Sequence, residues 1–225
     1  MVDSTELSKV VKPRDVALHM SMDYAHGIKD QTAKTVEEIN ALFERVKRPG
    51  YELDSFLMDV AEMISRSFGI ANTMIAVWDQ AHQVYRYRAV TGLEKETADA
   101  YKNLTYTKEH MIDERTYPSH KISTHTQLYL CEEHPYAEGE ETSYARPALL
   151  GMKRRSLSDS LEGDYMCFDF AGAGDEIMGW IETSGTRLRR LPETSSIRWI
   201  ELIACIVGSV IQLKEWTSQS TAEHP

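Results

Sequence analysis

Apolar residues recur along the chain at two spacings, one typical of helices and one typical of strands. A stripe of apolar residues at helical spacing predicts a helix over 33–48, which Pro49 and Gly50 end. A second stripe predicts a helix over 52–68, and Gly69 closes it. Both helices are amphipathic, so each has one side to bury.

The next segments change to the strand period. Residues 71–78 are mostly apolar, and residues 83–90 alternate between apolar and polar side chains across a turn at 79–82. Thr91 and Gly92 break the second strand, and residues 95–104 then read as a short helix. This order predicts a hairpin between two helices.

The last third of the chain has the strongest pattern. An apolar strand over 164–171 is followed by a Gly and Asp turn and a second strand over 176–184, which predicts an antiparallel hairpin. Pro192, with acidic and hydroxyl residues after it, then starts a helix over 194–216. Polar residues 186–190 form the loop between them.

The helix over 194–216 is apolar on nearly all sides, which indicates burial on more than one side. A membrane span is disfavoured, because the apolar stretch is shorter than the roughly 20 residues that a bilayer needs and contains Glu201 and Gln212. One stripe of this helix fits its own sheet and leaves a second stripe, which consists of Trp199, Ile203, Ile206, Val210 and Leu213. The small residues Gly208 and Ser209 favour close approach of another helix. We therefore predict a two-fold homodimer with the helices 33–48 and 194–216 at its interface.

These segments resemble the GAF domain superfamily. The resemblance is carried by Asp164 at the start of a strand, the strand IMGWI, and the run RRLPETSSIRWIELIACIVGSVIQ. It extends over 164–213 and 51–105 and is weakest over 106–163. It implies an α+β fold of PAS/GAF type, with an antiparallel sheet of about six strands, helices packed on one face and an N-terminal helical extension.

The same reading gives the domain organisation. We expect residues 1–30 to be a partly mobile N-terminal extension, with a short helix starting at Pro13. Residues 31–217 are expected to form a single GAF-like sensor domain that includes the two terminal dimerisation helices.

Composition narrows the choice of partners and compartment. Lys and Arg number 25 against 35 for Asp and Glu, which gives a formal net charge of −10. An acidic chain without a basic cluster is a poor nucleic-acid binder, because that affinity depends on neutralising phosphates. Three widely spaced cysteines and a polar N-terminus without a secretory signal indicate a cytoplasmic protein.

Residues 106–163 are polar and rich in tyrosine and histidine. In GAF domains the matching stretch covers the open face of the sheet and encloses the ligand, so we expect a pocket between this stretch and the strands 71–78 and 164–171. The side chains expected to bind a ligand there are Tyr117, His125, Cys131, Tyr144, Arg146 and Cys167. Among them Arg146 suits an anionic ligand, since a guanidinium forms paired hydrogen bonds.

The same segment also contains residue types that suit more specific chemistries. His120, His125, Cys131 and His134 are ligand types for zinc or haem iron, although their spacing matches no structural zinc pattern. The cysteines are too far apart for the GAF proteins that reduce methionine sulfoxide, and the sequence lacks the bilin and cyclic-nucleotide patterns of the family. No HExxH, GxSxG, CxxC or Gly-rich phosphate loop occurs.

The sequence thus predicts a non-enzymatic sensor domain that binds an unknown small molecule, without an assignable cofactor or metal. The terminal helices would pass the ligand state to a partner protein or output domain by a population shift. Two alternatives stay open: a haem, metal or redox sensor that uses His and Cys of 120–134 or Cys167, and an interaction or dimerisation module with no ligand.

Overall fold

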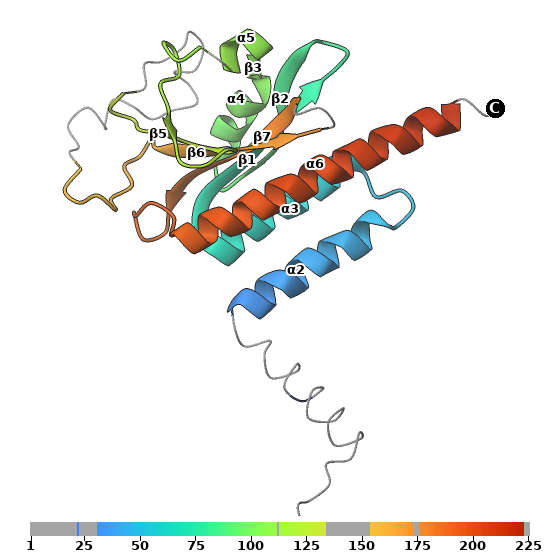
Figure 1. The fold of residues 1–225 in the computed structure, drawn as a ribbon, viewed down its shortest axis with the longest axis horizontal. Helices are drawn as coiled ribbons and strands as arrows, with labels where there is room; N and C mark the ends of the chain where they lie inside the picture. The colour runs from blue at the N-terminus through green and yellow to red at the C-terminus, as the bar shows by residue number, and fades with distance from the viewer. Residues whose placement is uncertain (1–21, 23–30, 112, 134–153, 173–175, 223–225) are drawn as a thin grey trace, which may run out of the picture. The chain divides into compact units, whose positions relative to one another are not determined.

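An antiparallel sheet of seven strands forms the centre of the fold (Figure 1). The computed structural model describes residues 22, 31–111, 113–133, 154–172 and 176–222. The strands lie in the order β3-β2-β1-β7-β6-β5-β4, and all neighbours are antiparallel. Their bounds are β1 Ile70–Asp79, β2 Val84–Thr91, β3 Thr105–Tyr106, β4 His120–Lys121, β5 Thr126–Tyr129, β6 Tyr165–Ala171 and β7 Ile177–Thr186.

The predicted pairing of 164–171 with 176–184 is confirmed by β6 and β7. In this hairpin Phe168 lies opposite Ile181, and Cys167 lies opposite Glu182. Strand β7 pairs on its other side with β1, where Ile181 faces Ile75. The two hairpins that the sequence indicated are therefore joined into one sheet through β1 and β7. The antiparallel α+β architecture is confirmed, with seven strands where about six were expected.

Helices accompany the sheet, and the bounds of those within the described residues are α2 Gln31–Val46, α3 Leu53–Phe68, α4 Lys95–Asn103, α5 Lys108–Met111 and α6 Thr194–Ala222. The chain divides into two compact units, residues 1–41 and 42–225, and the boundary falls within α2. The expected short helix at Pro13 and most of the extension 1–30 lie outside the described residues.

Helices α3 and α6 lie on one face of the sheet, as predicted (Figure 1). Helix α3 contacts β1 and β2, and α6 contacts β6 and β7. The side chains of Ile75, Phe168 and Ile181 are fully buried on this face. Full burial of such side chains contributes about 1.5–3 kcal/mol each. Helix α3 ends at Gly69, whose φ of 64° is the left-handed conformation that glycine adopts at low cost.

Helix α6 buries one side and exposes the other. Thr194–Lys214 is long and apolar enough, by length and composition alone, to cross a membrane. In the structure its side chains Ile200, Ile203, Ala204, Val207, Val210 and Ile211 are buried, whereas Leu202 and Leu213 are 47% and 54% exposed. Ile203 and Val210, which we had assigned to a stripe that needs a second subunit, are thus already buried within one chain.

Gly208 also differs from its expected role. The sequence predicts that it admits a helix from another subunit. A Cβ atom at this position would meet the Ala171 carbonyl oxygen at 3.1 Å and the Phe170 side chain at 3.4 Å. The glycine therefore allows α6 to approach its own strand β6 closely.

The opposite face of the sheet is covered by α4 together with parts of 104–133. Tyr101 of α4 is buried in one cluster with Met74 and Ala76 of β1. The expectation named α3 and α6 for one face, and the structure adds α4 on the other. This second face is where the structure has a cavity.

Candidate ligand pocket

A cavity lies between this second face and the segment that follows β3. Its volume is about 40 Å³, against the roughly 10–15 Å³ that a single ordered water needs on the same measure. It is partly open to solvent. The lining residues are Tyr87, Tyr106, His110, Met111, Tyr117, Tyr129, Tyr165, Cys167, Trp180 and Glu182.

Strand alternation explains which side chains line the cavity. Tyr165 and Cys167 of β6 lie on its cavity side, while Met166 and Phe168 point toward the helices. On β7, Trp180 and Glu182 share the cavity side, because Cys167 and Glu182 are opposite each other in the register. A strand buried on both faces thus supplies core on one side and part of the cavity wall on the other.

The wall of the cavity is mostly aromatic. The ring centroids of Tyr87, Tyr106 and Trp180 lie 5.9–6.1 Å from one another, in edge-to-face orientations. Tyr129 and Tyr165 stack at 4.3 Å with nearly parallel rings. Such pairs contribute about 0.5–1.5 kcal/mol beyond the burial of their area, so the wall is held by ring contacts as well as by the strands.

The floor of the cavity carries a buried carboxyl. Glu182 is 2% exposed, and its Oε2 accepts a hydrogen bond from the hydroxyl of Tyr87. Burial raises the pKa of Tyr87 well above its usual value, and the neighbouring Glu182 raises it further. The phenol of Tyr87 therefore stays protonated and acts as a donor.

Cys167 is a protonated thiol in this setting. Burial raises its pKa well above the usual value, and the carboxyls of Glu182 and Asp169 add to the effect. A neutral thiol is a poor nucleophile and a poor metal ligand, because both roles need the thiolate. Cys167 thus contributes shape and a weak donor to the cavity.

The expected site residues fall into three groups. Tyr117 and Cys167 both line the cavity. His125 is exposed and lies at a turn, where its carbonyl accepts a hydrogen bond from the Asp169 amide at 2.8 Å. Cys131 lies in a separate polar cluster, and neither it nor His125 is among the lining residues. Tyr144 and Arg146 lie outside the described residues. Ligand binding by all six stays a prediction.

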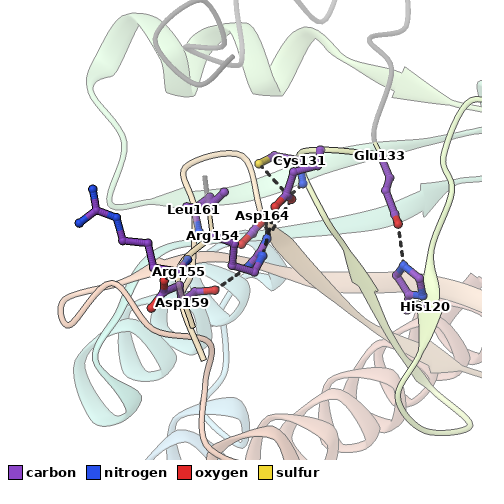
Figure 2. Close-up of polar contacts among 9 residues, drawn as sticks. His120, Cys131, Glu133, Arg154, Arg155, Asp159, Leu161 and Asp164 are labelled. Carbon is purple, nitrogen blue, oxygen red and sulfur yellow. Dashed lines mark hydrogen bonds and ion pairs between the residues drawn. The ribbon is translucent and has the colours of Figure 1, made fainter. Parts of the chain in front are cut away.

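The polar cluster around Cys131 is organised by an arginine (Figure 2). The Nη2 atom of Arg154 lies 3.0 Å from Asp164 Oδ1 and 2.9 Å from Glu132 Oε2. Asp164 also accepts hydrogen bonds from the amides of Cys131 and Leu161. The carboxylate of Asp164, at the start of the predicted strand 164–171, thus links the segment that contains Glu132 with the segment that begins at Arg154.

Cys131, Glu132 and Asp164 place their ligand-type atoms within 4.8 Å of one another. Arg154 already pairs with both carboxylates, and burial together with the charge of Asp164 raises the pKa of Cys131 to about 12. A cation there would have to displace the guanidinium. Of the other histidines in the metal hypothesis, His120 pairs with Glu133 at 2.6 Å (Figure 2), and His134 lies outside the described residues.

Sequence reasoning missed most of the lining. Tyr87, Trp180 and Glu182 lie in strands that were not assigned to the pocket, and Tyr165 lies in the strand 164–171, which was assigned to it, but was not named. One signal was available: an acidic residue, Glu182, follows the apolar run IMGWI on the same side as its tryptophan. A carboxyl inside a buried strand is expensive and for that reason marks a candidate site.

Comparison with known proteins bears on the fold. No protein-family model and no curated protein matches the sequence. Among solved structures, a GAF domain of a putative sensor histidine kinase from Pseudomonas syringae pv. tomato superposes with a TM-score of 0.52 at 11% identity, covering 88% of this chain and 99% of that one. The GAF domain of A. aeolicus nlh2, in an inactive state, gives 0.52 at 14% identity, covering 82% and 99%.

A third structure, of a GAF domain/HD domain protein from Geobacter sulfurreducens, gives a TM-score of 0.52 at 8% identity and covers 73% of this chain and 95% of that one. Identities this low carry information about the fold alone. The chain has a GAF-like fold, as the resemblance in its sequence implied.

Proposed function

We propose that this chain is a small-molecule sensor domain of GAF type, which binds its ligand in the aromatic cavity and does not catalyse a reaction. The observation that carries the proposal is a partly open cavity with a buried carboxyl on its floor, on the sheet face opposite α6. A concave, mostly apolar pocket with a few convergent polar groups is the usual form of a ligand site. The sensor kinase among the structural neighbours supports the signalling role by analogy only.

The path from ligand to output runs through β5, β6 and β7. Each of these strands presents side chains to the cavity, and β6 and β7 also contact α6. A ligand that orders the segment 106–117 over the cavity favours one arrangement of the sheet, and α6 follows. The ligand acts by its higher affinity for that arrangement, which is a population shift.

The exposed side of α6 is the proposed surface for a protein partner. Leu202 and Leu213 are large apolar side chains on its exposed side. We propose that a second copy covers this side in a homodimer, with α2 taking part as expected from its own stripe, and that a signalling protein or output domain reads the helix. The three cysteines are free thiols, which fits a reducing cytoplasm.

The dimer is tested by light scattering on a size-exclusion column. Leu202→Glu places a charge in the proposed interface and is expected to give a 25.7 kDa monomer. Leu188→Glu, at a loop position that is 81% exposed, is the matched control and should leave the dimer intact. A wild-type monomer at micromolar concentration would contradict the dimer.

Ligand binding is tested by native mass spectrometry of freshly purified protein. The wild type should carry a small molecule that is released on unfolding. Cys167→Leu adds volume inside the cavity and should abolish that extra mass, whereas the same change at the exposed Cys205 should keep it. An unliganded wild type that gains no thermal stability from a metabolite library would favour the interaction module without a ligand.

A further inference from the structure

The rings around the cavity surround one small space. Tyr87, Tyr106 and Trp180 are mutually about 6 Å apart, and Tyr117 lies 6.0 Å from Tyr106. The face of an aromatic ring attracts a positive charge within about 6 Å of its centroid, most strongly where water is excluded. Several rings around one space are the arrangement that holds substituted ammonium groups.

Buried carboxyl groups lie beside the cavity. The carboxyl of Glu182 is on the floor, and Asp169 is buried on the same face of the sheet, opposite Trp180 in the register. In the part of the chain that the structure describes, no Lys or Arg lines the cavity, and His110 at its exposed edge is the single base there. A carboxylate in a low-dielectric site attracts a cation and repels an anion.

Some tyrosine hydroxyls of the cavity wall already donate hydrogen bonds within the protein. Tyr87 donates to Glu182, and Tyr129 donates to Gln127 Oε1 at 2.9 Å. A neutral polar ligand would have to replace these bonds, while a cation would add to the existing arrangement. The cavity volume of about 40 Å³ fits the head of a molecule whose remainder leaves through the opening.

We infer that the cavity binds a small organic cation, with a substituted ammonium head held between the tyrosine and tryptophan rings and the carboxyl of Glu182. The inference rests on the proposed function of the same cavity and names the chemical class of its ligand. This ligand class differs from the anionic ligand that Arg146 suggested in the sequence. The described lining contains a carboxyl and no guanidinium, so it suits a cation better than an anion.

The test uses three probes of closely similar shape and different charge: choline, the neutral 3,3-dimethylbutan-1-ol and the anionic 3,3-dimethylbutanoate. Titration calorimetry of the full chain at constant ionic strength should show choline binding in the millimolar range or tighter. The alcohol should bind at least about ten-fold more weakly, since it lacks the charge. The carboxylate should show no binding.

Variants locate the site. Glu182→Gln keeps the shape and an acceptor for Tyr87, and it should weaken choline at least about ten-fold while leaving the alcohol unchanged. Glu96→Gln, at an exposed position of α4, removes the same charge elsewhere and should have no effect. Tyr117→Leu, at a partly exposed position, should also weaken choline, because it removes one ring from the wall.

In the titrations, two results would overturn the inference: choline that binds no better than the alcohol, including no binding of either, or choline affinity that is unchanged in Glu182→Gln. A neutral or anionic molecule found in the cavity by native mass spectrometry would overturn it too and would leave the sensor function standing. If no small molecule of any charge binds, the sensor function fails as well.

Discussion

The hydroxyl of Thr126 in β5 donates a hydrogen bond to the carboxyl of Glu201 in α6, with 2.6 Å between the oxygens. Ser123 donates to the same carboxylate oxygen. Three residues along β5, Tyr129 lines the cavity on the other face of the strand. Strand β5, next to the edge strand β4, is therefore tied to α6 by one side chain and to the cavity by another, which makes it a direct connection between the two.

Removing the Thr126 hydroxyl tests this connection. Thr126 is fully buried, so Thr126→Val should lower the free energy of unfolding by about 1.5–3 kcal/mol, the usual range for a hydrogen bond to a charged acceptor. Chemical denaturation measures the change. Thr105→Val, at an exposed position of the edge strand β3, is the control and should stay within about 0.5 kcal/mol of wild type. Equal losses in the two variants would contradict the assigned role.

Arg154 should be the main stabiliser of the polar cluster beside Cys131. The side chain of Asp164 is 1% exposed, and Arg154 pairs with it and with Glu132. Arg154→Met leaves a buried carboxylate without its cation, and we expect a loss of about 3 kcal/mol in the free energy of unfolding. The adjacent Arg155 is exposed, so Arg155→Met should be nearly neutral in the same measurement. Similar stabilities of the two variants would mean that Arg154 is a surface group.

Asp169 should make stability depend on pH. Burial raises its pKa from 3.8 to about 6, and His125 partly opposes the shift. Because the folded-state pKa lies above the unfolded one, the folded state holds the proton more tightly. Stability from this residue is thus greatest below pH 4 and is lost as pH rises through 6.

The isosteric variant Asp169→Asn removes this dependence. Relative to wild type, the variant should become more stable as pH rises, and its free energy of unfolding should gain up to about 3 kcal/mol between pH 4 and pH 8, as the shift of about two pH units implies. Denaturant titrations at several pH values measure the difference. Asp99→Asn, at an exposed position of α4, should show no such trend. A flat difference for Asp169→Asn would show that its carboxyl is not perturbed.

The elements with strong local patterns were predictable. The helix 52–68 and the hairpin of 164–171 with 176–184 follow from periodicity and turn residues. Their arrangement in one antiparallel sheet with helices on a face was implied by the resemblance to GAF domains. Tyr117 and Cys167 were placed near a pocket because the resemblance located the covering segment. The pattern did not indicate which side of β6 faces the helices, since the strand is apolar on both sides.

The rest of the cavity depends on contacts between residues far apart in sequence. Tyr87 and Glu182 are separated by 95 positions and meet because β1 lies between β2 and β7. No local pattern carries that information. The surroundings of Cys131 are a similar case: Asp164, 33 positions later, accepts a hydrogen bond from its backbone amide in a cluster apart from the cavity.

The central claim, that occupancy of the cavity changes α6, is tested most directly by amide hydrogen exchange without knowing the ligand. Purified wild type is compared with protein stripped of bound small molecules by unfolding, dialysis and refolding, and Cys167→Leu is treated in the same way. Stripping should lower protection in 106–117, in β5 and in the part of α6 that faces β6, and it should change nothing in Cys167→Leu. Identical exchange before and after stripping of the wild type, or a change confined to 106–117, would contradict the account.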